Sequence, residues 1–173
     1  MSIAIETRHL AKSFRSGSGH CFAAARVLYD VNLAVVAGDA LAIVGRQGSG
    51  KSVLMLCLAG LLSPDLGLVR WFGDPAVASA ARHVLLHRSK ADLMRFGRCD
   101  APHVHLVDLD DSAGLAQLAD WVASRQLAGD AVILAARHRS RVPTDWPMAV
   151  LAEGRVRRVG REAAARVAEG ASG

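Results

Sequence analysis

One stretch decides the fold: Gly45-Arg46-Gln47-Gly48-Ser49-Gly50-Lys51-Ser52. Its spacing, a glycine followed five residues later by Gly-Lys-Ser, is that of a phosphate-binding loop. The glycines carry no Cβ, so the backbone can turn back on itself and direct successive amide groups at one point. The apolar residues 41–44 predict a buried parallel strand before the loop, and the apolar run 53–62 predicts a helix after it. Strand, loop and helix in this order favour an α/β fold.

The loop is expected to bind the phosphates of a nucleoside triphosphate. The helix that starts near Gly50 adds the positive end of its dipole, and Lys51 can reach the outer phosphates. The hydroxyl group of Ser52 is placed to ligate Mg²⁺. The alternative is a glycine-rich turn that happens to precede a lysine, and the strand and helix on either side argue against it.

Length and composition predict one globular domain. The chain has 173 residues, of which 51% are hydrophobic and 21% charged, so it is long enough and apolar enough to bury a core. Its longest apolar run, residues 53–62, is too short to cross a bilayer. Residues 1–6 lack the basic flank and apolar core of a secretory signal. We therefore expect no transmembrane segment in the chain and a cytoplasmic protein.

Charge and cysteine usage narrow the expected partners. The net charge is +5, but the positive residues are scattered along the chain and nearly all are arginine, so we expect no nucleic-acid partner. A basic surface could equally face anionic lipid headgroups. The three cysteines, Cys21, Cys57 and Cys99, show no paired spacing and predict free thiols in a reducing compartment.

Periodicity and turn residues predict antiparallel strands that lead into a parallel core. The expected strands begin with an opening strand around residues 3–10 and continue at 26–33, 40–44, 68–72, 82–87, 104–107, 131–135, 148–151 and 155–159, the last two as a hairpin. The expected helices are 53–62, 89–96 and 115–127. The alanine-rich residues 163–173 predict a flexible tail.

Several segments together resemble the ATP-binding cassette of ABC transporters. They are residues 28–33, residues 37–39, the phosphate loop and residues 58–67, in that family's order and spacing. The resemblance implies a P-loop NTPase core, in which helices flank a parallel sheet, and an N-terminal antiparallel β subdomain. It also implies one ATP-binding domain over residues 1–162, with 163–173 as the tail.

The resemblance extends to further site residues. Phe14 stands where the family stacks an aromatic ring on adenine, although an ordinary core aromatic is the alternative. Residues 102–108 resemble the Walker B strand, whose aspartate, here Asp108, would hold Mg²⁺ through water. The alternative for Asp108 is a capping residue of the next turn. Residues 129–137 match the strand that leads to the switch histidine, so Arg137 or His138 would lie near the γ-phosphate.

The full set of expected ligands follows from the motif and the resemblance. The residues expected to bind ATP are Phe14, Gly45, Arg46, Gln47, Gly48, Ser49, Gly50, Lys51, Ser52, Val53, Arg137 and His138. Those expected to ligate Mg²⁺ are Ser52 and Asp108. His103 and His105 lie two residues apart, which could suit another metal, but no third ligand is evident and no such site is expected.

Departures from the family pattern bear on catalysis. In active cassettes a glutamate follows the Walker B aspartate, and here that residue is Leu109. No glutamine lies near Leu86 or His87, where the family has one. Only 20 residues separate His87 from Asp108, too few for the helical subdomain that carries the family's L-S-G-G-Q signature. We therefore assign no catalytic residue and expect MgATP binding with weak or no hydrolysis.

Three interpretations stay open at this point. The chain could be a degenerate ATP-binding subunit that works with an integral-membrane permease and a second cassette, peripherally at the inner face of the cell membrane. It could instead be a soluble regulatory nucleotide-binding module. The third interpretation is a truncated remnant of an active ATPase, which would expose apolar surface where the helical subdomain packs.

Overall fold

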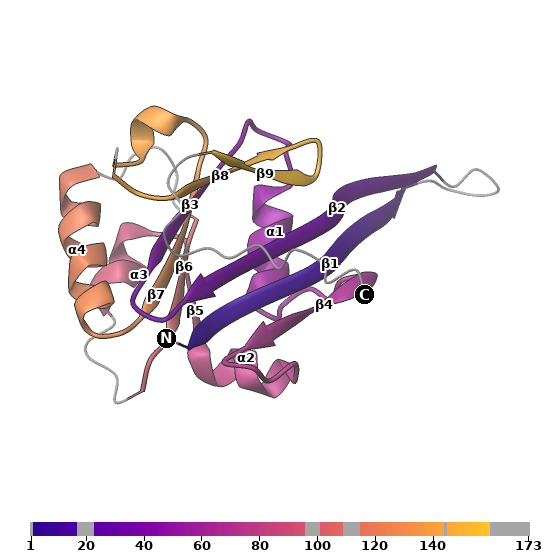
Figure 1. Cartoon of the computed structure of the whole chain (residues 1–173). Coiled ribbons are helices and arrows are strands. Elements are labelled where there is room, and N and C mark those ends of the chain that lie inside the picture. The colour runs from indigo at the N-terminus through magenta and orange to yellow at the C-terminus, as the bar shows by residue number, and fades with distance from the viewer. Residues whose placement is uncertain (1, 17–22, 96–100, 109–114, 144, 160–173) are drawn as a thin grey trace.

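The computed structural model describes residues 2–16, 23–95, 101–108, 115–143 and 145–159, which form two sheets with helices between and beside them (Figure 1). The first sheet is antiparallel and has the order β2-β1-β4. Its strands are β1 (Ile3–Ser16), β2 (Ala23–Val36) and β4 (Leu66–Trp71). This sheet confirms the N-terminal antiparallel subdomain that the sequence predicts.

The second sheet is the mostly parallel core, with the order β5-β6-β7-β3-β8-β9. Strand β9 is its antiparallel edge, and the other neighbouring pairs run parallel. The strands are β3 (Ala40–Val44), β5 (Val84–His87), β6 (Val104–Val107), β7 (Ala131–Ala136), β8 (Met148–Ala152) and β9 (Arg155–Val159). The predicted α/β fold class is confirmed.

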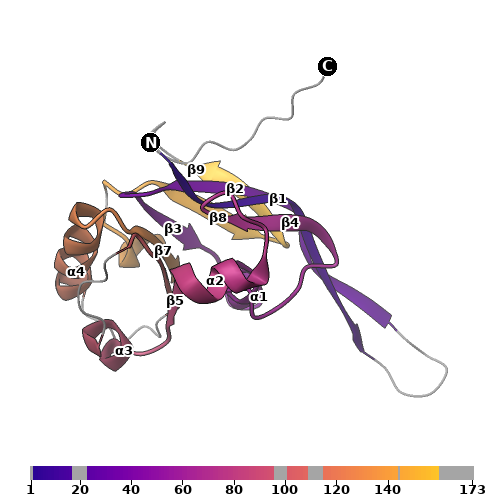
Figure 2. The same cartoon turned by 90° about the horizontal axis from the view of Figure 1, so that it is seen from below.

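Helices cover both faces of the core sheet. They are α1 (Lys51–Leu58), α2 (Val77–His83), α3 (Lys90–Arg95), α4 (Leu115–Leu127) and the short 3-10 helix η1 (Arg139–Arg141). Figure 2 shows α4 on one side of this sheet and α1, with the antiparallel sheet, on the other. The sheet is therefore the middle layer of the molecule, and its central strands are shielded from water on both faces.

Alternation along β3 and β7 divides the interior into two cores. Leu41 and Ile43 point into the core beside α1, together with Ile133 of β7. Ala42 and Val132 point into the core beneath α4. A strand buried on both faces needs an uninterrupted apolar run, which is the pattern that predicts these two strands from the sequence.

The segment between β4 and β6 differs from expectation. Residues 82 and 83 are predicted as strand but end α2, a helix that the sequence pattern does not predict. Its Ala80 packs against Gly60, where a Cβ atom would lie only 2.8 Å from the Ala80 side chain. This tertiary contact stabilises a short helix whose own sequence has weak periodicity. The predicted helix 53–62 also ends early, at Leu58, and Gly60 follows with a left-handed φ of 69°.

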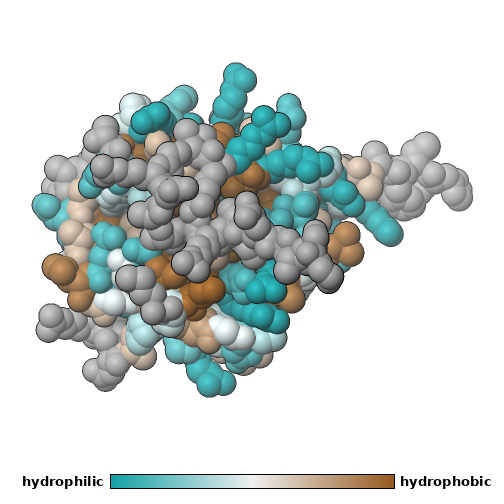
Figure 3. All heavy atoms as spheres, viewed as in Figure 1, coloured by the Kyte–Doolittle hydropathy of each residue, from teal (hydrophilic) through white to brown (hydrophobic). Residues whose placement is uncertain are grey.

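The surface carries scattered hydrophobic side chains. Figure 3 shows hydrophobic residues on one face as separate patches between hydrophilic ones. The large hydrophobic residues that the structure describes as exposed are spread over β1, β4, α2, α4 and the loop after α1: Ile3, Phe14, Leu61, Leu66, Val77 and Leu127. Within the described ranges, no helix combines the length and apolar character needed to cross a bilayer.

One cysteine can be placed. Cys57 is a buried free thiol in α1, and burial raises its pKa to about 11. It is therefore an unreactive core residue at neutral pH. Cys21, Cys99 and the predicted tail 163–173 lie outside the described residues.

Candidate functional site

The loop at residues 45–50 joins β3 to α1 in the core sheet. A Cβ atom at Gly45 would overlap the carbonyl oxygen of Leu151 and would lie 2.6 Å from the Ser49 hydroxyl. Gly48 and Gly50 have φ angles of 79° and 101°, in the left-handed region that favours glycine. Glycine is therefore needed at position 45 because other atoms approach its backbone closely, and at positions 48 and 50 because their φ angles are positive.

The Lys51 side chain folds back over this loop. Its ammonium group donates hydrogen bonds to the carbonyl oxygens of Gly45 and, at 2.9 Å, of Arg46. Partial burial lowers the pKa of Lys51, the nearby charge of Asp108 opposes that shift, and the charge of Arg137 adds to it. Lys51, Asp108 and Arg137 are thus close enough to act on one another electrostatically.

A pocket of about 550 Å³ opens over the loop and the ends of the parallel strands. Its volume is in the range typical of small-molecule sites. It is lined by Val27, Gln47, Gly48, Gly50, Lys51, Ser52, Val53, Arg88, Asp108, Ala135, Ala136 and Arg137. Eight of these residues belong to the predicted ligand set, and the structure brings them together from three separate parts of the sequence.

Five predicted residues do not line the pocket: Phe14, Gly45, Arg46, Ser49 and His138. Three of them belong to the loop itself, where Gly45 and Arg46 accept hydrogen bonds from Lys51. Phe14 lies instead on the β1–β2 hairpin, with the Lys12 Nζ atom 5.7 Å from its ring centroid. Its stacking on adenine stays a prediction, whereas Val27 of β2 does line the pocket.

Asp108 lies at the pocket because of the sheet register. His87 pairs with Val107 at the ends of β5 and β6, and the Asp108 amide donates to the His87 carbonyl oxygen at 2.9 Å. The carboxyl ends of parallel strands meet at one edge of a sheet, so Asp108 lies at the edge where the phosphate loop begins. Asp108 and Ser52 then offer a carboxylate and a hydroxyl oxygen to the same space.

This donor pair suits Mg²⁺. Hard oxygen ligands are what Mg²⁺ prefers, and in nucleotide sites it takes the remaining ligands from phosphate and water. Among the residues that the structure describes, no group of three or more His, Cys, Asp or Glu side chains is arranged to hold a metal on its own. The site therefore fits a magnesium ion that arrives with phosphates better than a metal held by protein alone.

Four lining residues lie outside the predicted ligand set: Val27, Ala135, Ala136 and Arg88. Arg88 is the charged residue among them. It directly follows β5, as Asp108 directly follows β6. A signal for it exists, because a charged residue at the carboxyl end of a core strand is a candidate ligand in α/β folds. The predicted strand 82–87 ends at the correct residue, His87. Near this strand end the sequence pattern shows only that a family glutamine is missing, and it does not single out Arg88.

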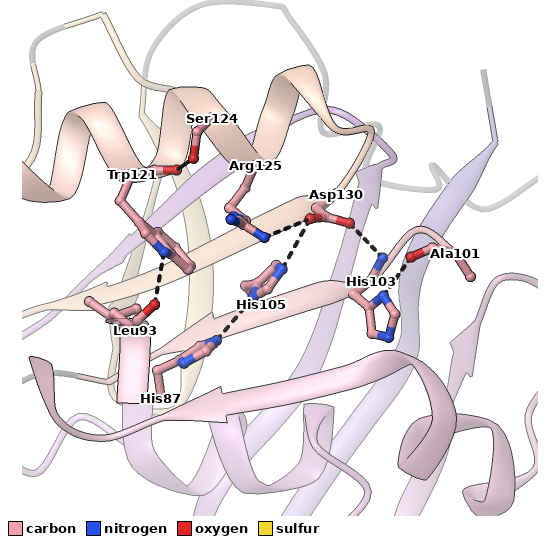
Figure 4. A network of polar contacts seen from close by, with 9 residues as sticks. All are labelled: His87, Leu93, Ala101, His103, His105, Trp121, Ser124, Arg125 and Asp130. Atoms are coloured by element: carbon pink, nitrogen blue, oxygen red, sulfur yellow. Dashed lines mark hydrogen bonds and ion pairs between the residues drawn. The ribbon is translucent and has the colours of Figure 1, made fainter. Parts of the chain in front are cut away.

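A buried polar network lies behind this sheet edge (Figure 4). His87 Nε2 and His105 Nδ1 are 2.9 Å apart, and His105 Nε2 is 3.2 Å from Asp130 Oδ2. The carboxylate of Asp130 can only accept, so His105 donates from Nε2 and its Nδ1 accepts from His87. With both rings neutral, His87 donates to His105 and His105 donates to Asp130.

Burial sets the protonation of the two histidines. It lowers the pKa of His87 to about 4, and the neighbouring His105 adds to this shift. Burial also lowers the pKa of His105, against the opposing charge of Asp130. The edge of the Trp121 ring packs against both histidines, and the Trp121 indole nitrogen donates to the Leu93 carbonyl oxygen at 3.1 Å.

The same network accounts for the closely spaced His103 and His105. His105 is engaged with His87 and Asp130, while His103 Nδ1 lies 2.6 Å from the Ala101 carbonyl oxygen. The His103 amide donates to Asp130 Oδ1 at 2.9 Å. The two side chains thus have separate structural partners rather than a shared ligand.

Comparison with known proteins identifies the family. The family model described as ABC transporter matches residues 28–159. An aliphatic sulfonates import ATP-binding protein of Pseudomonas aeruginosa is 36% identical over 143 residues, which is 83% of this chain and 46% of that protein. A hemin import ATP-binding protein of Nocardia farcinica is 40% identical over 105 residues, covering 61% of this chain and 32% of its own length. The chain spans less than half the length of these two relatives.

Solved structures agree on the fold. An ATP-binding cassette of an ABC transporter in its ADP conformation superposes with a TM-score of 0.69 at 13% identity, covering 93% of this chain and 92% of its own. The CbiO1 protein of Clostridium perfringens, part of an ABC transporter complex, gives a TM-score of 0.67 at 16% identity and covers 91% and 88%. The family model matches well over half of the chain, which shows that the chain belongs to the ABC transporter family.

Proposed function

We propose that this chain is an ATP-binding subunit of an ABC transporter and binds MgATP in the pocket over the phosphate loop. The observation that carries the proposal is the convergence of Lys51, Ser52 and Asp108 on one pocket. Cassettes of this family bind ATP with Mg²⁺ in general, and these three residue types supply the charge and the oxygen ligands that such binding needs.

Each part of the pocket has a proposed role. The backbone amides of residues 45–50 and the start of α1 bind phosphate oxygens, and Lys51 leaves its carbonyl partners to reach the outer phosphates. Ser52 and Asp108 ligate Mg²⁺, Asp108 through water. Arg137 places its positive charge near the same phosphates. Phe14 and His138 stay predictions from the resemblance, without a proposed contact.

We further propose that hydrolysis is weak or absent. The residue after Asp108 is Leu109, which cannot accept a proton from an attacking water molecule. Its position in space lies outside the described residues. Between β5 and β6 the structure describes one helix, the six-residue α3. This is consistent with a degenerate cassette that lacks the signature-bearing helical subdomain.

The proposed partners follow from the relatives. Their names describe ATP-binding proteins of import systems, for sulfonates and for hemin. We propose that residues 1–162 form one cassette domain, which acts beside an integral-membrane permease and a second cassette at the inner face of the membrane. A second cassette with its own signature would complete the nucleotide site of this chain.

Replacing Lys51 with alanine is expected to weaken ATP binding by at least about tenfold, because a charge-assisted hydrogen bond to phosphate contributes about 1.5–3 kcal/mol. Isothermal titration calorimetry with ATP and Mg²⁺ on wild type and Lys51→Ala measures this. Lys12→Ala is the matched control, since Lys12 pairs with Asp65 at 2.8 Å and does not line the pocket. It should leave ATP affinity unchanged.

A phosphate-release assay on the same proteins tests the hydrolysis part separately. Wild type should release phosphate well below about 1 s⁻¹, the lower end of ordinary enzyme turnover. Turnover at or above that rate, lost in Lys51→Ala, would overturn the proposal of weak hydrolysis. The proposal that the protein binds MgATP would still stand. Wild-type protein that binds no ATP in calorimetry would overturn the function itself.

A further inference from the structure

The side chains that line the pocket carry more positive than negative charge. Three of its lining residues are cationic, Lys51, Arg88 and Arg137, and one, Asp108, is anionic. The lining side chains therefore carry a net charge of +2. A polyphosphate of charge about −3 to −4 is attracted to such a pocket even before a divalent cation contributes.

Arg88 lies beside the proposed magnesium ligand. The register of β5 and β6 ends with His87 opposite Val107, so Arg88 and Asp108 directly follow the paired ends of two adjacent parallel strands. Such strands lie about 4.8 Å apart. The Arg88 side chain therefore starts from the backbone next to Asp108. In the proposed function, this is where the terminal phosphate and its Mg²⁺ bind.

The backbone of Arg88 is held on both sides. Before it, His87 is fully buried and linked to His105. After it, Ser89 and Asp92 form reciprocal hydrogen bonds in which the Asp92 carboxylate accepts from the Ser89 amide at 2.9 Å and the Asp92 amide donates to the Ser89 hydroxyl at 3.2 Å. The Asp92 carboxylate also accepts from the Arg88 amide at 3.1 Å.

The Arg88 side chain, by contrast, is exposed while lining the pocket. A fixed backbone and an exposed guanidinium suit a residue that reaches out to a ligand. A guanidinium can donate two parallel hydrogen bonds to one phosphate group, which a lysine cannot do with the same geometry.

We propose that Arg88 is a phosphate-binding residue that contacts the terminal phosphate of a bound nucleoside triphosphate and allows the pocket to hold it without a divalent cation. This inference rests on the proposed function and adds a ligand to it. It predicts that Arg88 matters most when Mg²⁺ is removed, because the guanidinium and the cation neutralise the same oxygens.

The test is calorimetric titration of ATP with Mg²⁺ and with EDTA. Arg88→Gln should lose about tenfold or more in ATP affinity in EDTA, and threefold or less with Mg²⁺, since one charge-assisted hydrogen-bonding group is removed. Arg88→Lys should lie between wild type and Arg88→Gln. Arg157→Gln is the matched control, because it removes the same charge from exposed β9, outside the pocket lining. It should change affinity less than twofold in either buffer.

Inorganic tripolyphosphate is the second probe, and it separates this inference from the proposed function. Wild type that binds ATP, with Arg88→Gln unchanged in EDTA, would overturn the role of Arg88 alone. Wild type that binds tripolyphosphate but not ATP, with that binding lost in Arg88→Gln, would support Arg88 and overturn the nucleotide function. Binding of neither probe to wild type would overturn both.

Discussion

The variant Gly154→Ala is expected to lose about 3 kcal/mol of unfolding free energy, because it combines a strained backbone with a steric clash. Gly154 lies at the turn of the β8–β9 hairpin and has a φ of 71°. A Cβ atom there would overlap the Val27 carbonyl oxygen and would lie 2.7 Å from Cδ2 of Tyr29. The Gly154 carbonyl oxygen also accepts a hydrogen bond from the Tyr29 amide at 2.7 Å. The hairpin turn therefore has no room to move away from β2 without breaking that bond.

Urea denaturation of wild type and variant measures the loss. Gly129→Ala is the matched control, because Gly129 has a similar φ of 86° but nothing within 4 Å of the added Cβ. It should lose only about 1 kcal/mol, the cost of placing alanine in the left-handed region. Equal losses in the two variants would show that backbone strain alone acts at Gly154 and that the contact with β2 has no steric role.

The same substitution should also weaken ATP binding. Val27 lines the pocket, and its carbonyl oxygen lies 3.1 Å from the position of a Cβ atom on Gly50. A shift of β2 at Val27 therefore reaches the phosphate loop through direct contact. The β8–β9 hairpin thus influences the shape of the site through β2, although no hairpin residue is among those that line the pocket.

The phosphate loop and its flanking strands could be predicted because their constraints are local. Left-handed glycines at 48 and 50 and the apolar run of β3 are needed whatever the rest of the chain does. Asp108 could be placed because residues 102–108 resemble the Walker B strand, in which a buried strand delivers a carboxylate to the sheet edge. Gly48, Gly50 and Asp108 line one pocket in the structure.

Other parts depend on contacts that the sequence does not display. Helix α2 exists where Ala80 meets Gly60, 20 residues earlier, so its residues 82 and 83 are wrongly predicted as strand. Arg88 needs the β5–β6 register before its neighbour Asp108 is apparent. The buried pairing of His87 with His105 likewise appears only once the two strands are aligned.

Acid is expected to destabilise the fold through His87. Burial lowers the pKa of His87 to about 4 in the folded protein, against an ordinary value of 6.5. The unfolded chain therefore binds a proton more readily, and the stability that the neutral ring supports is complete above pH 6.5 and is lost as the pH falls toward 4. Between pH 7 and pH 5 this one group should reduce the free energy of unfolding by about 2 kcal/mol.

Several charged or titratable groups near the His87 ring contribute to the direction of its pKa shift. His105 and, to a smaller extent, Arg125 oppose its protonation, whereas Asp92 favours it. Asp130 is engaged through His105 rather than with His87 itself. Because burial is the largest cause and His105 the next, the net effect is a neutral His87 throughout the physiological range.

Urea denaturation of wild type and His87→Gln at pH 7 and pH 5 tests this. Glutamine does not titrate but can still donate to His105 Nδ1, so the variant should lose about 2 kcal/mol less than wild type over this pH interval. The exposed His138 provides the control, and His138→Gln should follow the wild-type pH dependence. A His87→Gln protein as acid-sensitive as wild type would refute the assignment, because the loss would then arise from the remaining groups. Since Arg88 follows His87 directly, the same protonation would disturb the strand end that holds this arginine at the pocket.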